Sequence, residues 1–147
     1  MKIRTYNDAD WSDWLRMSAA LFPEESAEAL AKGMKEFGAR PDAAVFLAER
    51  DDGSIAGFLE AGSRPYADGC DTSPVGYVEA WYVDPDVRRA GYGRALLRAA
   101  EEWARRQGYV EMASDALLDN EASHAAHQHS GYEEVGRVVQ FRKVLGE

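Results

Sequence analysis

The chain has almost no cysteine: among its 147 residues, only Cys70 carries a thiol. A single cysteine rules out an intramolecular disulfide, and no Cys/His spacing typical of a zinc site is present. No run of residues approaches the ~18 apolar residues of a membrane-spanning helix. The first residues, MKIRTYNDADW, lack the apolar stretch of a secretory signal peptide. We therefore expect a cytoplasmic protein with no membrane partner.

Basic residues are also scarce, with 17 Lys and Arg against 26 Asp and Glu, for a net charge of −9. Such an acidic chain repels phosphate backbones, so no nucleic-acid partner is expected. The positive charge that exists is concentrated between Arg88 and Arg106, where six arginines against two acids give +4. The remaining 11 bases and 24 acids give −13. This division is compatible with one local anion site and with a cationic partner elsewhere.

Apolar residues are plentiful enough for a core, at 46% of the chain, and the length fits one domain over residues 1–147. The alternation of apolar patterns predicts a mixed α/β (α+β) domain. The expected elements are a strand at 3–6, helices at 11–22 and 26–37, strands at 44–49 and 54–61, a long loop at 63–76, a strand at 77–83, a helix at 91–107, a strand at 110–114, a helix from 119 or 120 to 131, and one or two strands at 135–144.

The sharpest motif is the Arg-x-x-Gly-x-Gly turn that begins at Arg88 and opens the longest helix. Backbone N–H groups at such a turn, together with the positive end of the helix, can cradle an anion. Gly91 and Gly93 let the backbone approach a ligand closely. The same pattern also occurs as a plain tight turn, and it matches neither a Walker loop nor a dinucleotide fingerprint.

Two carboxylates are candidate functional residues because of their positions in or directly after predicted strands. Glu79 interrupts an otherwise apolar strand, and a carboxylate there could take the proton of an alkyl ammonium, whose pKa is ~10.4. It could equally face solvent, because it alternates with Val78 and Ala80. Asp115 follows the next strand, where ligands gather in open α/β sheets, or it is a turn or capping residue.

Two segments of the second half of the chain together resemble the GNAT superfamily of N-acetyltransferases. Residues 78–97 are similar to its acetyl-CoA-binding motif, and the run from Asn120 through His127 to Gly131-Tyr132 is similar to a second motif. The likeness to aminoglycoside 6'-N-acetyltransferases extends nearly end to end. It includes Leu21-Phe22-Pro23, the loop 66–75, Glu79, residues 111–115 and the ending Phe141-Arg142-Lys143.

This resemblance implies a GNAT fold, with a mixed, mostly antiparallel sheet of six to seven strands flanked by about four helices. It implies acetyl transfer from acetyl-CoA, by direct attack of the amine, to the 6'-amino group of a polycationic aminoglycoside, in a homodimer. No metal is expected, because Glu121-x-x-His124 has no second copy and every histidine lies between 124 and 129. Glu79 would be the general base, and the acceptor would contact Phe22, Tyr66, Glu79 and Asp115, although Phe22 could instead belong to the core. Acetyl-CoA would contact Trp81, Tyr82, Val83, Arg88, Arg89, Ala90, Gly91, Tyr92, Gly93, Arg94 and Asn120.

The chain departs from the family pattern at two positions. His127 stands where the superfamily often has a tyrosine that is proposed to protonate the leaving thiolate. Gly136 stands where some aminoglycoside enzymes have an acid, and Glu133 or Glu134 could compensate. Two other functions stay open: acetylation of another amine, such as a polyamine, a protein N-terminus or a small amino compound, and a non-catalytic sensor that binds acyl-CoA or a drug.

Overall fold

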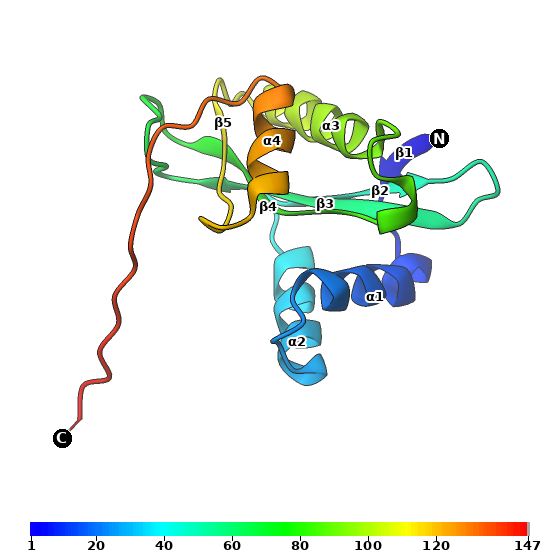
Figure 1. The fold of residues 1–147 in the computed structure, drawn as a ribbon, viewed down its shortest axis with the longest axis horizontal. Coiled ribbons are helices and arrows are strands. Elements are labelled where there is room, and N and C mark those ends of the chain that lie inside the picture. The colour runs from blue at the N-terminus through cyan, green and yellow to red at the C-terminus, as the bar shows by residue number, and fades with distance from the viewer. Residues whose placement is uncertain (147) are drawn as a thin grey trace.

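A computed structural model describes residues 1–146 (Figure 1). One sheet carries five strands in the spatial order β1-β2-β3-β4-β5; the first four are antiparallel, and β5 runs parallel to β4. Short 3₁₀ turns at Asp8–Asp10 and Pro85–Val87 precede α1 and α3. The elements in chain order are β1 (Lys2–Thr5), α1 (Trp11–Leu21), α2 (Ala27–Gly38), β2 (Ala44–Glu49), β3 (Ile55–Arg64), β4 (Val75–Val83), α3 (Tyr92–Arg106), β5 (Met112–Ser114) and α4 (Glu121–His129).

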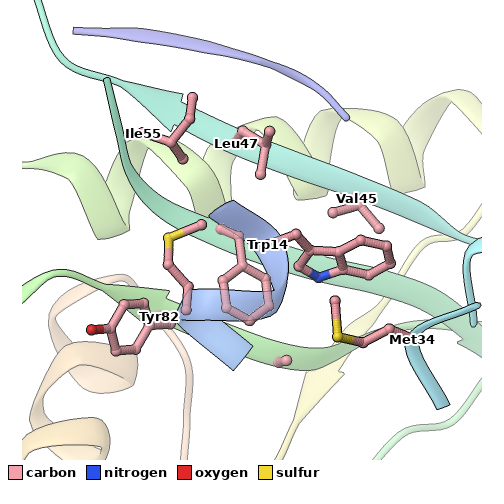
Figure 2. Packing of buried hydrophobic residues seen from close by; sticks show 9 residues of the cluster. Trp14, Met34, Val45, Leu47, Ile55 and Tyr82 are labelled. Atoms are coloured by element: carbon pink, nitrogen blue, oxygen red, sulfur yellow. The ribbon is translucent and has the colours of Figure 1, made fainter. Parts of the chain in front are cut away.

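Helices cover both faces of the sheet: α1 and α2 lie on one face, and α3 and α4 lie on the other (Figure 1). On the first face, Trp14 and Met17 of α1 pack on inward side chains of the strands (Figure 2). On the second face, Leu96 and Leu97 of α3 pack on Leu59 of β3. Because both faces of β2 and β3 are covered, these strands are apolar in nearly continuous runs.

Local signals in the sequence account for the helix ends. The Ser26 hydroxyl accepts a hydrogen bond from the Ala29 N–H at the start of α2, and the Asn120 side chain accepts one from the Ser123 N–H at the start of α4. The expected helix start at Ser26 is confirmed, and of the two expected starts of the last helix, Asp119 and Asn120, the cap is Asn120. None of the helices in residues 1–146 is long and apolar enough to cross a membrane.

The expected strands at 135–144 are absent, and the sheet has five strands where six or seven were expected. Beyond Tyr132 the chain is extended: Val135 still lies against Gly69, and the end of the chain then runs away from the domain (Figure 1). Its apolar side chains are exposed, and Phe141 is 93% accessible. A strand forms only where a neighbouring strand accepts its hydrogen bonds, and residues 133–146 have no such neighbour within the described chain. We call residues 133–146 the C-terminal arm.

Candidate active site

The site forms where β4 and β5 separate. The two strands pair only from Gly76–Met112 to Val78–Ser114, whereas β4 stays paired with β3 as far as Val83. The last five residues of β4 therefore have an open edge on the β5 side. The Asp84 N–H donates to the Ala56 carbonyl 2.7 Å away. Because pairing alternates along antiparallel strands, the backbone groups of Trp81 and Val83 then face the open edge.

Tyr82 differs from its two neighbours on β4. The same alternation directs its backbone groups to β3, and its side chain is buried in the cluster beneath α1 and α2 (Figure 2). The open edge of β4 is therefore made by Trp81 and Val83, and the expectation that Tyr82 contacts acetyl-CoA finds no support in its position.

Glu79 lies on a β-bulge at this separation point. Glu60 is opposite Ala80 and Ala61 is opposite Val78, which leaves Glu79 as the extra residue of β4. Its side chain is 20% exposed and does not point freely into solvent. Instead, both of its oxygens accept hydrogen bonds from Arg64, at 3.0 Å from Nε and 2.6 Å from Nη2. No pattern in the sequence indicates a role for Arg64.

Tyr77 connects this ion pair to Asp115. The Arg64 guanidinium lies over the Tyr77 ring, with Cζ 3.6 Å from the ring centroid. The Tyr77 hydroxyl donates to the Asp115 carboxylate. Burial first, and then the hydrogen bond to Asp115, raise the pKa of Tyr77 well above its ordinary value. Asp115 is thus joined to Glu79 through two side chains that no sequence pattern had singled out.

A hollow of about 1080 Å³ opens beside β5, and its lining includes Arg64, Tyr66, Tyr77 and Asp115. The Tyr66 ring is 69% exposed, and its hydroxyl donates to Asp68 at 2.9 Å. Phe22 follows the last residue of α1, and its side chain is exposed. The alternative interpretation, that Phe22 belongs to the core, is therefore wrong. It is not part of the hollow's lining.

The Arg-x-x-Gly-x-Gly segment forms the turn into α3. Gly91 has a φ of 90° and no side chain caps the helix, while Arg89 has a φ of 66°. The first N–H groups of α3 are therefore not capped by any side chain. Gly93 lies against Trp81 of β4, and the Trp81 indole N–H donates to the Gly93 carbonyl at 3.0 Å. The turn is thereby held beside the open edge of β4.

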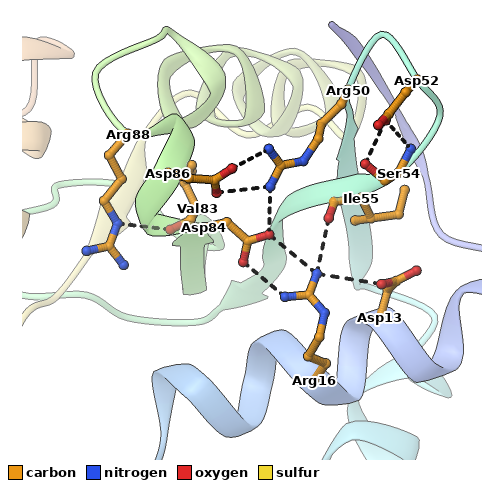
Figure 3. Close-up of polar contacts among 10 residues, drawn as sticks. All are labelled: Asp13, Arg16, Arg50, Asp52, Ser54, Ile55, Val83, Asp84, Asp86 and Arg88. Carbon is orange, nitrogen blue, oxygen red and sulfur yellow. Dashed lines mark hydrogen bonds and ion pairs between the residues drawn. The ribbon is translucent and has the colours of Figure 1, made fainter.

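A network of ion pairs holds Asp84 and Asp86, the residues just before this turn (Figure 3). Asp84, at the end of β4, is buried and accepts hydrogen bonds from Arg16 at 3.0 Å and from Arg50 at 3.2 Å. Arg50 also binds both oxygens of Asp86. The Arg88 Nε donates to the Val83 carbonyl at 2.9 Å, on the side of β4 that faces away from β3.

Helix α4 lies over the separation of β4 and β5 and places His127 against both strands. The His127 ring is 5.1 Å from the Trp81 ring, and its Nε2 is 2.7 Å from the Ser114 Oγ. Its Nδ1 is 2.7 Å from the Ser123 carbonyl oxygen. A carbonyl only accepts, so Nδ1 carries a proton, and in the neutral ring Nε2 accepts from the Ser114 hydroxyl. Asn120 caps α4 with its side-chain oxygen.

Glu60 is a second carboxyl near the bulge, on the face covered by α1. Its Oε2 accepts a hydrogen bond from the Trp14 indole N–H at 3.0 Å. Burial raises the pKa of Glu60 to about 7, against the effect of the Trp14 hydrogen bond and with a further contribution from Glu79. Cys70 packs against Val75 and Tyr77 in the loop between β3 and β4, and burial raises the pKa of its thiol.

The candidate site therefore combines an uncapped, arginine-rich helix start with two carboxylates at the point where parallel strands separate. Within residues 1–146 no group of three or more metal-ligating side chains is gathered. The chain belongs to the acetyltransferase (GNAT) family, whose model matches residues 8–132.

Within that family, the chain is similar to aminoglycoside N(6')-acetyltransferases. It is 43% identical to the type 1 enzyme of Klebsiella aerogenes over 147 residues, covering 97% of this chain and 96% of the relative. It superimposes on the crystal structure of aminoglycoside 6'-N-acetyltransferase AAC(6')-Ih from Acinetobacter baumannii with a TM-score of 0.90 and 36% identity, covering 99% of both chains. It also matches AAC(6')-Iy in complex with a bisubstrate analog, CoA-S-monomethyl-acetylneamine, with a TM-score of 0.91, 34% identity and 98% of both chains.

Proposed function

We propose that the chain is an aminoglycoside 6'-N-acetyltransferase, built as one acetyltransferase domain, that moves an acetyl group from acetyl-CoA to an amine. The observation that carries this proposal is the open edge of β4. Along this edge lie the uncapped helix start at Gly91 and the carboxylates of Glu79 and Asp115, which Arg64 and Tyr77 link. A reaction between a polyanionic acetyl donor and a polycationic acceptor needs both kinds of site next to one another.

The residues at the turn fit the binding of acetyl-CoA, which supplies the acetyl group as a thioester. The uncapped N–H groups after Gly91 and the side chains of Arg88, Arg89 and Arg94 would hold the pyrophosphate. A Cβ atom added at Gly91 would meet no protein atom within 4 Å, so the protein does not fill the space beside the turn. Ala90, Tyr92, Gly93 and Asn120 complete this set, with the Trp81 and Val83 backbone along the open edge.

Glu79 is the general base in this proposal. The acceptor's amine is protonated near neutral pH and must lose that proton before it attacks. The Val83 N–H, turned to the open edge, is the donor that we assign to the carbonyl oxygen of the thioester as negative charge develops there. Asp115 and the exposed rings of Tyr66 and Phe22 would contact the other charged groups and the sugar rings of the acceptor.

We further propose a cytoplasmic homodimer. The C-terminal arm exposes Val138, Val139 and Phe141, and the edge of β5 that faces away from β4 has no strand beside it within the described residues. Apolar side chains and an unpaired sheet edge are both stabilised when another chain covers them, and a second copy of this chain is the partner always at hand. A single free cysteine, Cys70, fits a reducing compartment.

An acceptor screen tests the proposed activity. Release of free thiol from acetyl-CoA is measured with a 6'-amino aminoglycoside, with spermidine, and with a peptide that has a free N-terminus. We expect rapid release with the aminoglycoside alone. Release only with spermidine or with the peptide would move the chain to another acetyltransferase activity. Calorimetric binding of both ligands without thiol release would identify a sensor.

A further inference from the structure

The carboxylate that we assign to the acceptor already holds a cation that belongs to the chain. Arg64 donates two hydrogen bonds to the two oxygens of Glu79, at 3.0 and 2.6 Å. In this bidentate arrangement both oxygens accept from one planar guanidinium. While both oxygens accept from Arg64, an amine has to compete with the guanidinium for this carboxylate.

The surroundings of Arg64 form a site for a positive charge. The Tyr77 ring presents its face to the guanidinium at 3.6 Å, a distance at which an aromatic ring attracts a cation. Asp115 adds a second negative charge just beyond the Tyr77 hydroxyl. The hydrogen bond to Glu79, and then the charges of Glu79 and Asp115, raise the pKa of Arg64 against the opposing effect of burial. An alkyl ammonium, like a guanidinium, is a cation that donates hydrogen bonds, so a carboxylate and an aromatic face attract it as well.

The Arg64 side chain is also able to rotate away from Glu79. It is the last residue of β3, directly before the long loop that separates β3 from β4, and its side chain is 43% exposed. In the described residues, its side chain hydrogen-bonds to Glu79 alone. Rotation into solvent would break this ion pair and the contact with the Tyr77 ring, and it would leave the backbone pairing of β3 unchanged.

We propose that Arg64 is an internal counter-cation that occupies the acceptor's ammonium subsite and is displaced by the incoming amine. This inference rests on the proposed function. A monoamine gains too little to replace a bidentate arginine, whereas a polycation adds contacts with Asp115 while it displaces Arg64. Arg64 thereby selects polycationic acceptors, and Glu79 becomes able to take a proton only when the acceptor is in place.

The test compares two variants that lose a similar arginine. Arg64→Met keeps an apolar stem over the Tyr77 ring but removes the cation. Arg40→Met is the control for the loss of an arginine, since Arg40 also forms a two-bond pair with Asp42 and is similarly exposed, with one further hydrogen bond to the Ser63 carbonyl at 3.1 Å. We expect Arg64→Met to lower the acceptor KM by about fivefold, the size of a partly exposed ion pair, with the KM for acetyl-CoA unchanged. Arg40→Met leaves both constants within about twofold.

Free guanidinium ion, at concentrations that do not unfold the protein, gives the decisive readout. In Arg64→Met the subsite is vacant, so guanidinium inhibits competitively against the acceptor, and calorimetry detects its binding. It does neither in the wild type nor in Arg40→Met. If guanidinium instead restores a kcat lost in Arg64→Met, Arg64 positions Glu79 during the reaction, and displacement is wrong. An unchanged acceptor KM without inhibition also overturns it.

The failure of this inference can be told apart from the failure of the proposed function. If the wild type acetylates no aminoglycoside, the proposed function falls. The calorimetric comparison of guanidinium binding to Arg64→Met and to Arg40→Met still reports whether the subsite exists. Specific binding to Arg64→Met supports a cation subsite under Arg64, and equal binding to both variants rejects it.

Discussion

Glu79 owes its position to a single extra residue in β4. The bulge opposite Glu60 and Ala61 places its carboxylate at the point where β5 departs, with Arg64 bound to both oxygens. In a regular strand, side chains alternate between the two faces of the sheet. The bulge interrupts this alternation and so changes the direction of the Glu79 side chain. The sequence shows a glutamate among apolar residues, but it does not show the bulge, because register depends on the partner strand.

Replacing Glu79 by Gln tests its role as the base. Gln keeps the size and one acceptor oxygen, but it cannot take a proton at neutral pH. We expect kcat to fall by about a hundredfold or more, while the calorimetric affinity for acetyl-CoA stays unchanged. A variant that keeps wild-type kcat would show that another group, or water alone, removes the proton.

Glu60 makes the stability of the fold depend on pH. Burial raises its pKa from 4.5 to about 7, so between these values the folded chain binds more protons than the unfolded chain. The free energy of unfolding therefore falls as pH rises through this range. Glu60→Gln should remove the contribution of Glu60 to the pH dependence of the free energy of unfolding. At pH 8 we expect it to raise this free energy by at most about 3 kcal/mol.

Urea denaturation at several pH values measures this effect. Glu28→Gln, on the exposed surface of α2, is the matched control and should leave the pH dependence as it is in the wild type. Equal pH profiles for Glu60→Gln and the wild type would mean that Glu60 is charged without cost in the folded state.

At the scale of elements, helices were easier to predict than sheet edges. The caps at Ser26 and Asn120 and the apolar stripe of α3 are local signals, and they placed α2, α3 and α4 to within a few residues. The strands predicted at 135–144 were wrong because alternating apolar residues report only that a segment can pair. They do not report whether a neighbouring strand lies within reach in the same chain.

The start of α3 offers a test of the anion site. At Gly91, with its φ of 90°, Asn tolerates the backbone better than most residues, and Asp has the same shape with a negative charge. We expect Gly91→Asp to weaken acetyl-CoA binding more than about tenfold beyond the effect of Gly91→Asn. Calorimetry with each variant measures this, and equal affinities for the two variants would show that no phosphate lies near this turn.

The ion-pair network under the turn is a structural element in its own right (Figure 3). Asp84→Asn removes a buried charge from between Arg16 and Arg50 and leaves both arginines undercompensated. We expect a loss on the order of 3 kcal/mol in the free energy of unfolding, measured with urea. Asp86→Asn, whose side chain is 65% exposed, should cost less than about 1 kcal/mol. Equal losses of free energy of unfolding in the two variants would show that burial of Asp84 does not increase its contribution to stability.

For the whole molecule, the uneven charge noted in the sequence acquires a spatial meaning. The arginines from Arg88 to Arg94 surround the start of α3, whereas Glu79 and Asp115 lie where β4 and β5 separate. The sequence could predict that these charges differ in role. It could not predict that Arg64 and Tyr77 lie between the two carboxylates, because that contact joins residues from different strands.

The oligomeric state tests the role of the C-terminal arm. We expect the protein to sediment as a dimer, and Phe141→Asp to shift it toward the monomer, because a charge would be buried in the contact. Gln140→Asp adds the same charge at the neighbouring polar position of the arm and should leave the dimer largely intact. Sedimentation of the wild type as a monomer at every concentration would contradict the proposed dimer.

The most direct measurement of the proposed function uses two acceptors that differ at one position. Neomycin has an amine at the 6' carbon, and paromomycin has a hydroxyl there, with the rest of the molecule the same. Thiol release from acetyl-CoA should be rapid with neomycin and absent with paromomycin. Equal release with the two compounds would place the acetyl group on a different amine, and no release with either would contradict the assignment of this chain as an aminoglycoside 6'-N-acetyltransferase.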